Sequence, residues 1–453
     1  MIKNNDYIKE FKVDLSCLTK DELVVLEKLV EAAKLIAQVY IAQLKDGFYP
    51  KDATRQEIEK AASKDSEILS PYTIVKRDSS GKLITIPYHE QYHSLLEPIA
   101  QKLKEAAEEV LHHPDFKKML LIQAKALLNG NYDQAETSWK KIKPFILDIV
   151  IGPLERIEDN MFFTKRSYQA WVGVMNKNVT NRFSTLKDIV YSARRQAFPS
   201  ERVDLMEKAQ LRMDETVIFS GMIANYQYTA TTLPNDIDLL EKYGSEGWIF
   251  LPSLRENFED RQYKLFNLIF APFFKASFSK EELFRGYMLI AAMHEIARII
   301  VRYRFAVSRL RELYPVFNEL TTEALGVKMM GTLLIKDVIS QKELESALVM
   351  FLTRMFDGYH NQISYKSGLG PLMMGNAILM NSLVESGAVK ITDEGISWPN
   401  FTKMFFSVSE LAEAMEKIMA EGTYQDAQIY LKKHSSLAVF KKFASALKAL
   451  HKA

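Results

Sequence analysis

Residues 294–298 read His-Glu-Ile-Ala-Arg, and their types and spacing come close to a metal-dependent catalytic site. In the pattern His-Glu-x-x-His, two imidazoles one helical turn apart bind a zinc ion, and the glutamate is the general base. This chain has His294 and Glu295, but Arg298 stands where the second imidazole belongs. A guanidinium keeps its proton near neutral pH and offers no lone pair to a metal. The segment therefore predicts either a zinc hydrolase with a substitute ligand or the shell of one.

A purely structural role for the same segment stays open. Residues 283–300 form a densely apolar run with helical spacing, which predicts a buried helix. On such a helix Glu295 and Arg298 are three residues apart and can pair with each other. His-Glu pairs also arise by chance, and His89-Glu90 is a second one in this chain.

Size and composition indicate a large globular protein. The chain has 453 residues, of which 47% are hydrophobic and 26% charged, so it is long enough for two domains. A net charge of +2 gives no electrostatic reason to expect nucleic acid as a partner. The apolar stretches fall short of the roughly 20 residues that span a bilayer, so we expect no membrane partner. A single cysteine, Cys17, and an N-terminus without an apolar signal core predict a cytoplasmic protein.

Helical periodicity dominates the sequence. Apolar residues recur every three to four positions over 20–46, over two segments within 91–128, and over 133–146 and 158–194. The two segments within 91–128 are separated near residues 112–115. Thr19 followed by Glu22 predicts a capped start for the first helix. The C-terminal part of the chain is again helical.

Strand signals are fewer and lie apart in the sequence. Residues 73–75 and 83–86 flank the turn at 78–81 and predict a hairpin. Short strands are also predicted at 216–219, 226–232, 248–251 and 389–391. The sequence thus predicts a mainly α protein with a small β element from separated segments, which is an α+β class.

Four segments in register resemble the dipeptidyl peptidase III family of zinc metallopeptidases, in particular its shorter bacterial and plant-type members. They are IGPLERIEDNMFF at 151–163, ATTLPND at 230–236, RELYPVFNELTTEALG at 311–326 and GNAILMNSLVESGA at 375–388. The similarity extends with gaps over most of the chain. On these segments the chain is identified as a degenerate member of that family.

The resemblance implies two lobes around a wide cleft. One lobe would comprise residues 1–174 and 212–250 and hold the β element. The other lobe, mostly helical, would comprise residues 175–211 and 251–453 and carry the degenerate metal motif. Peptides would lie between the lobes.

The resemblance also implies roles for residues of the metal motif. Family members bind zinc through two histidines and a glutamate, and His294 and Glu319 match the first and third of these ligands. Glu295 matches the base that activates the metal-bound water, and Arg298 stands at the second histidine. Glu323 matches a carboxylate that would orient a ligand imidazole. Glu319 and Glu323 could instead be solvated helix charges.

Other positions are matched to substrate binding or depart from the family. Asn235 and Glu155 match substrate-binding residues, whereas Thr232 stands where the family has a substrate-binding asparagine. Asn235 could equally be a turn residue, and Glu155 a surface charge. Residues 371–373 align with a segment whose histidine is thought to support the transition state, and they contain no histidine.

These departures predict that zinc is absent or weakly bound, since only His294 and Glu319 remain as ligands. The guanidinium of Arg298 would then replace the metal by pairing with Glu295, Glu319 or both. The expected function is that of a catalytically impaired pseudopeptidase that holds a peptide or protein ligand in the cleft. Two alternatives stay open. One is an active metallopeptidase that releases dipeptides from short peptide N-termini with a compensating ligand, for example His360. The other is a hydrolase of a different kind that reuses the cleft.

Overall fold

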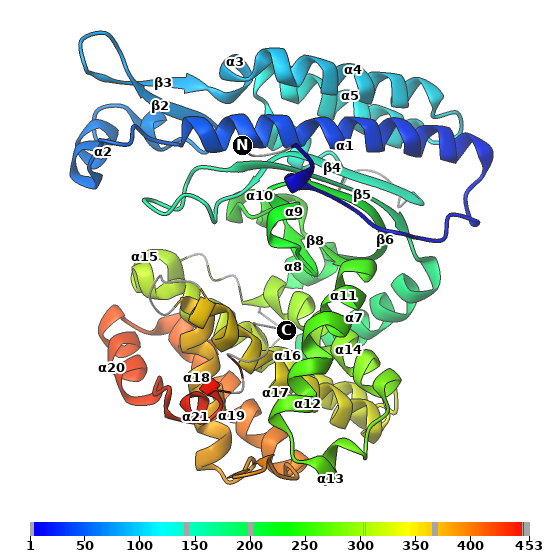
Figure 1. The fold of residues 1–453 in the computed structure, drawn as a ribbon, viewed down its shortest axis with the longest axis vertical. Coiled ribbons are helices and arrows are strands. Elements are labelled where there is room, and N and C mark those ends of the chain that lie inside the picture. Colours follow the sequence, from blue (N-terminus) through cyan, green and yellow to red (C-terminus); the bar gives the residue numbers. More distant parts are fainter. Residues whose placement is uncertain are drawn as a thin grey trace. The chain divides into compact units, whose positions relative to one another are not determined.

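The computed structural model describes residues 4–139, 145–197, 203–301, 303, 305–364, 370–445 and 447 (Figure 1). The chain divides into two compact units. Unit 1 comprises Met1–Thr180, Arg212–Tyr228 and Leu233–Ser253, and unit 2 comprises Asn181–Leu211, Thr229–Thr232 and Leu254–Ala453. Helices make up most of the described chain, and the strands form one six-stranded sheet and two short pairs. The predicted α+β class is therefore confirmed.

Unit 1 combines one long helix with shorter helices and most of the sheet. Its helical segments are η1 (Asn4–Tyr7), α1 (Lys20–Asp46), α2 (Arg55–Ala62), η2 (Ser66–Leu69), α3 (Tyr88–Gln91), α4 (His93–Glu109), α5 (Pro114–Asn129), α6 (Tyr132–Glu136), α9 (Met222–Tyr226) and α10 (Ile237–Tyr243). The predicted helix over 20–46 is confirmed. At its start the Thr19 side chain accepts from the backbone of Glu22, and the Glu22 carboxylate accepts from Thr19 N.

The strands of the large sheet are β1 (Ile8–Glu10), β4 (Leu147–Glu155), β5 (Ser167–Met175), β6 (Gln210–Gly221), β7 (Ala230–Leu233) and β8 (Glu246–Phe250). Their order is β4-β5-β6-β8-β7, with β1 beside β6, and β5 is antiparallel to both β4 and β6. Strands β2 (Thr73–Arg77) and β3 (Leu83–Pro87) form the predicted hairpin in full register. Helix α1 lies along the sheet, with α4 and α5 beyond it (Figure 1).

The prediction of helix over 158–194 is wrong for its first half. Residues 167–175 form strand β5, and helix α7 (Lys177–Ala197) begins only after it. The prediction over 133–146 is also wrong beyond Glu136, because α6 ends there and β4 begins at Leu147; residues 140–144 lie outside the described chain. Eight of nine residues in β4 and in β5 are buried. A strand buried on both faces shows no polar alternation, so its apolar run resembles that of a buried helix.

The loop between β4 and β5 is organised by one carboxylate. Asp159 accepts hydrogen bonds from four backbone N–H groups, including those of Met161 and Lys165, at 2.9–3.1 Å. Burial would raise the pKa of Asp159, but these donors hold it below its usual value. The Lys165 side chain is completely buried, and its Nζ donates to Ser70 O and Thr73 Oγ1, each at 2.8 Å.

Unit 2 is a helical assembly. Its described elements are α8 (Val203–Lys208), the π-helical turn η4 (Phe258–Gln262), α12 (Tyr263–Ile269), α13 (Pro272–Lys275), α14 (Lys280–Ile300), α15 (Ala306–Leu310), η5 (Arg311–Leu313), α16 (Tyr314–Ile335), α17 (Gln341–Ser364), α18 (Pro371–Glu385), β9 (Ile391–Thr392), β10 (Gly395–Ile396), α19 (Phe401–Glu421), α20 (Tyr424–His434) and α21 (Ala438–Lys441). Most of α7 also belongs to it, and α11 (Leu251–Asn257) crosses its boundary with unit 1. Helix α14 packs against α16 and α17, and α16 packs against α18 and α19.

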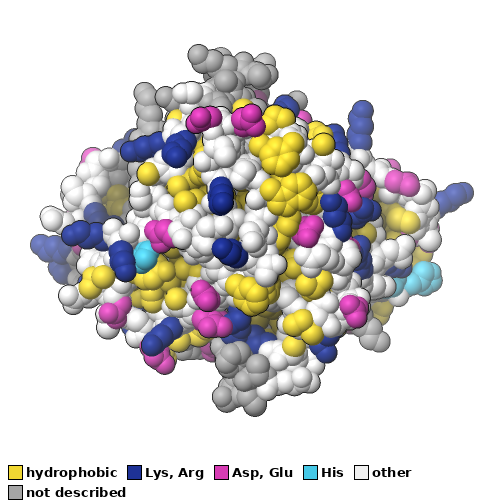
Figure 2. Space-filling model, turned by 90° about the horizontal axis from the view of Figure 1, so that it is seen from below, with side chains coloured by type: hydrophobic (Ala, Val, Ile, Leu, Met, Phe, Trp, Pro, Cys, Tyr) yellow, Lys and Arg dark blue, Asp and Glu magenta, His cyan; other side chains and the backbone are white. Residues whose placement is uncertain are grey.

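One face of the molecule, shown in Figure 2, carries basic, acidic and apolar side chains interspersed with one another. Mixed charge of this kind is typical of a surface that faces water. No helix in the described part of the chain combines the length and the apolar composition that crossing a bilayer requires.

The buried Lys165 predicts a pH-dependent stability. Burial lowers the pKa of Lys165 from 10.5 to about 7, so between these values the unfolded chain binds a proton that the folded chain does not. We expect the free energy of unfolding to rise with pH from about 7 to about 10, by up to a few kcal/mol, and Lys165→Met to lose this rise. Urea unfolding of both proteins across this pH range measures it. The exposed Lys104 on α4 gives the control Lys104→Met, which should keep the rise.

Candidate functional site

Helix α14 carries the three motif residues at its C-terminal half. The helix is capped by Ser279 and Glu282, whose side chains each accept a hydrogen bond from the other's backbone N–H. Apolar residues surround its second half on nearly all sides, which is the pattern of a core helix. His294 and Glu295 are consequently buried, with 6% and 4% of their surface exposed.

Helix α16 brings two further carboxylates to His294. A Cβ atom added at Gly326 would lie 3.1 Å from Met293 O, so this glycine lets α16 pass directly over α14 one residue before the histidine. Glu319 and Glu323 are four residues apart and therefore share one face of α16. The close crossing at Gly326 places that face against His294.

The Arg298 guanidinium lies between His294 and Glu319. Its Nη2 atom is 2.9 Å from His294 Nε2 and 3.1 and 3.2 Å from the two carboxylate oxygens of Glu319. Arg298 Nε is also 3.8 Å from Glu295 Oε2. One cationic group thus contacts the imidazole and both acidic residues that the metal motif would use.

The other edge of the His294 ring faces Glu323. His294 Nδ1 lies 3.0 Å from Glu323 Oε1, and Arg354 Nη2 on α17 donates to the same oxygen at 3.0 Å. Burial alone would raise the pKa of Glu323, but the Arg354 guanidinium and the imidazole overcome it and lower the pKa to about 2. Because Arg298 can only donate, His294 Nε2 accepts this hydrogen bond, and the Nδ1 edge of the ring faces Glu323.

Thr232 of β7 contacts Glu295, the residue matched to the general base. The Thr232 hydroxyl donates to Glu295 Oε2 at 2.6 Å, and Thr232 is only 1% exposed. A short bond to a charged acceptor is strong and holds the carboxylate in one orientation. Thr232, predicted at a substrate-binding position, therefore contacts a residue of the predicted metal motif.

The remaining two predicted residues lie in unit 1 and contact each other. Asn235 Nδ2 donates to Glu155 Oε2 at 3.1 Å, and Asn235 N lies 3.4 Å from Glu136 Oε1. Asp236, the next residue, caps α10 by accepting from the backbone of Asp238 and Leu239. Asp236 is thus the residue whose side chain stabilises the turn, whereas the Asn235 side-chain amide donates to Glu155.

The residues that would hold a zinc ion do not fit one as they stand. The described residues contain no group of three or more His, Cys, Asp or Glu side chains arranged to hold a metal. The space between His294 Nε2 and Glu319 holds a guanidinium nitrogen within hydrogen-bonding distance of both. The side chain of His360, considered as a substitute ligand, lies outside the described residues.

Sequence reasoning missed Arg354. It lies in α17, outside every motif, and the only signal in the sequence is a basic residue in an otherwise apolar stretch of helix, LVMFLTRMF. Of the predicted departures, residues 371–373 begin α18, where Met373 is buried in the core. Asn318, directly before Glu319, accepts a hydrogen bond from the Tyr314 hydroxyl at 3.1 Å.

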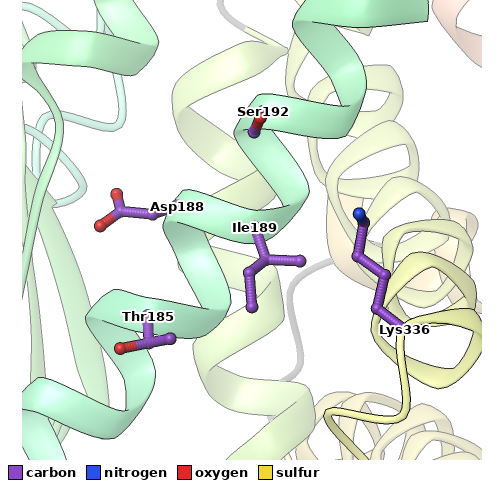
Figure 3. A pocket seen from close by; sticks show the side chains of 5 residues that line it. All are labelled: Thr185, Asp188, Ile189, Ser192 and Lys336. Atoms are coloured by element: carbon purple, nitrogen blue, oxygen red, sulfur yellow. The ribbon is translucent and has the colours of Figure 1, made fainter.

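A cavity of about 310 Å³ in unit 2 is lined by other residues, namely Thr185, Asp188, Ile189 and Ser192 of α7 and Lys336 directly after α16 (Figure 3). Figure 3 shows Ile189 and Lys336 on facing sides, whereas Asp188 points away from Lys336. The Asp188 carboxylate pairs with Lys187 instead. We therefore assign this cavity no part in the candidate site.

Comparison with solved structures shows the fold. The chain is similar to the structure of dipeptidyl peptidase III from Caldithrix abyssi, with a TM-score of 0.83 and 22% identity over 98% of this chain and 96% of that one. It is also similar to dipeptidyl-peptidase III from Corallococcus sp. strain EGB, with a TM-score of 0.77 and 18% identity over 97% and 93% of the two chains. The chain therefore has a dipeptidyl peptidase III-like fold, as the resemblance predicted.

Comparison with known sequences gives a plant relative. The chain is 24% identical over 407 residues to Nudix hydrolase 3 from Arabidopsis thaliana, which covers 86% of this chain. The chain spans about half the length of that relative. No family model matches the sequence.

The hydrogen bond between Thr232 and Glu295 should contribute measurably to stability. We expect Thr232→Val to lower the free energy of unfolding by about 2 kcal/mol, because a buried carboxylate loses its donor without a change in side-chain volume. Thr353→Val is the matched control, since the Thr353 hydroxyl is equally buried but bonds only to Val349 O of its own helix. Chemical denaturation should give a clearly smaller loss for the control, and equal losses would contradict the assigned interaction.

Proposed function

We propose that this chain is a catalytically impaired member of the dipeptidyl peptidase III group that binds a peptide or protein partner in the cytoplasm. The observation that carries the proposal is the position of Arg298 Nη2, which contacts both His294 and Glu319. In the proposed reading the guanidinium takes the place of the catalytic metal. The likeness of fold to two peptidase structures supports the peptide as the class of ligand.

Electrostatics argues against a metal ion beside Arg298. A zinc ion bound by His294 and Glu319 would have two protein ligands, where a catalytic site has about three. It would also lie within a few ångströms of a fixed positive charge, and two such charges in a poorly solvated site repel by several kcal/mol. Both effects weaken zinc binding, so we propose that zinc is absent or weakly bound.

Without the metal, there is no acidified water from which the matched general base, Glu295, could remove a proton. A catalytic zinc lowers the pKa of its bound water from its high value in bulk water to about 7, which is what lets a carboxylate remove the proton. Glu295 alone would face ordinary water. We therefore propose that Glu295 has become a structural acceptor for the Thr232 hydroxyl and an ion-pair partner of Arg298.

Peptide binding would rest on residues outside the metal motif. Asn235 and Glu155 are held together in unit 1 and offer an amide and a carboxylate. These groups suit the amino terminus of a peptide, because a carboxylate pairs with an ammonium and an amide bonds to the backbone. This assignment comes from the resemblance and is part of the proposal.

An active metallopeptidase is the second candidate. Two observations favour it: His294 and Glu295 are kept, and Glu323 and Arg354 still fix the imidazole as a metal site requires. It would need a ligand that displaces Arg298 or binds beside it. A hydrolase of another kind that reuses the cleft is a further possibility, and hydrolysis that persists in chelator would support it.

Zinc content separates the candidates. After zinc loading at neutral pH and exhaustive dialysis, we expect mass spectrometry to find close to zero zinc per chain, because Arg298 competes for both ligands. No dipeptide should be released from a synthetic hexapeptide. Near one zinc per chain, with dipeptide release that a chelator stops, would contradict the proposal and establish the second candidate.

Peptide binding is tested by calorimetry with the same hexapeptide and its N-acetylated form. We expect the free amino terminus to bind at least about tenfold more tightly, or ~1.4 kcal/mol, because acetylation removes the charge that Glu155 would pair with. Glu155→Gln should remove most of this preference, whereas the exposed Glu108→Gln on α4 should not. Equal binding of both peptides to the unchanged protein would exclude Glu155 from the ligand site.

A further inference from the structure

We propose that Arg298 serves as a built-in cation that keeps a latent zinc site closed, and that Arg298→His alone would open this site to zinc. The inference rests on the proposed function, since it starts from the guanidinium in the place of the metal. It goes further in assigning Arg298 a positioning role between α14 and α16. It also predicts which groups would take the metal.

The charges around His294 require a cation at this position. The carboxylates of Glu295, Glu319 and Glu323 each lie within 4.0 Å of a ring nitrogen of His294. Arg354 pairs with Glu323 at the oxygen that also faces His294, which leaves Glu295 and Glu319 facing Arg298. Removing the guanidinium would leave a buried carboxylate and a half-buried one close together, which is costly.

The imidazole is already oriented for a metal. Its Nδ1 edge is held by Glu323, and Glu323 is held in turn by Arg354. Its Nε2 edge points toward Arg298 and Glu319. A carboxylate behind a ligand histidine fixes the ring and its tautomer in metal sites. This support does not depend on Arg298 and would survive its replacement.

The spacing also suits zinc. His294 Nε2 is 3.7 Å from Glu319 Oε2. Two ligands about 2.0–2.1 Å from one tetrahedral zinc ion lie roughly 3.3 Å apart, so a shift of a few tenths of an ångström would close the pair on a metal. An imidazole at position 298, one helical turn from His294, would project on the same helix face and supply the third ligand.

The experiment compares the unchanged protein with Arg298→His and Arg298→Met. Each is loaded with zinc chloride at neutral pH, dialysed exhaustively, and assayed for bound zinc and for Tm with and without chelator. We expect Arg298→His to retain near one zinc per chain and to lose Tm in chelator. The unchanged protein should retain no zinc and keep its Tm in chelator.

Arg298→Met tests the cation role separately. Methionine keeps much of the side-chain volume but carries no charge and no nitrogen or oxygen ligand, so this variant should have a Tm lower by roughly 3 °C or more and should not gain it back with zinc. A Tm equal to that of the unchanged protein would overturn the cation role. Cobalt(II) substitution gives a further readout, since a four-coordinate site in Arg298→His should show intense visible absorption.

The outcomes distinguish this inference from the proposed function. A folded Arg298→His that retains no zinc overturns the latent site but leaves the pseudopeptidase proposal intact. Zinc on the unchanged protein overturns both. Zinc on Arg298→His that survives the added change His294→Ala or Glu319→Gln shows that the metal binds elsewhere and overturns the assigned ligands. An Arg298→His that folds only in the presence of zinc supports the inference.

Discussion

The arrangement of the candidate site depends on the hydrogen bonds from Arg298 Nη2 to His294 and Glu319. A metal and a guanidinium can both neutralise two acidic side chains in a buried site. They differ in what else they do: a metal ion offers an open coordination position and acidifies water, whereas a guanidinium only donates hydrogen bonds. Under the proposed function, the geometry that stabilises the helix pair would also remove the chemistry for which the motif is used elsewhere.

The site depends on how closely two helices approach. Gly326 allows α16 to pass over α14 at Met293, and a similar close passage occurs at Gly286, where an added Cβ would lie 2.4 Å from the α17 backbone at Ser346. Helix α14 is thus held between α16 and α17 at short range. This is why Glu319 and Glu323 from α16 and Arg354 from α17 all reach the α14 motif. A larger residue at either glycine would push the helices apart and so separate the side chains of the site.

Sequence reasoning succeeded where a pattern is local. The amphipathic stripe of α1 and the turn between β2 and β3 were enough to place those elements, because α1 has one buried and one exposed face and a short turn fixes the pairing of its two strands. Strands β4 and β5 have no exposed face, so their composition did not distinguish them from helix. In the site, the contact between Arg298 and His294 follows from helical spacing alone. Glu319 required the family resemblance, and Arg354 required the fold, since no spacing rule connects it to Glu323.

The contacts around His294 form a chain of paired polar groups. The imidazole has a carboxylate behind it, that carboxylate has a guanidinium beside it, and Glu295 accepts a hydrogen bond from Thr232. Removing one partner from any of these contacts would leave the other group buried and unpaired, which destabilises a protein whether or not it turns over a substrate. Under the proposed function, the charge pairs of a metal site would therefore persist as structure once Arg298 takes the metal's place.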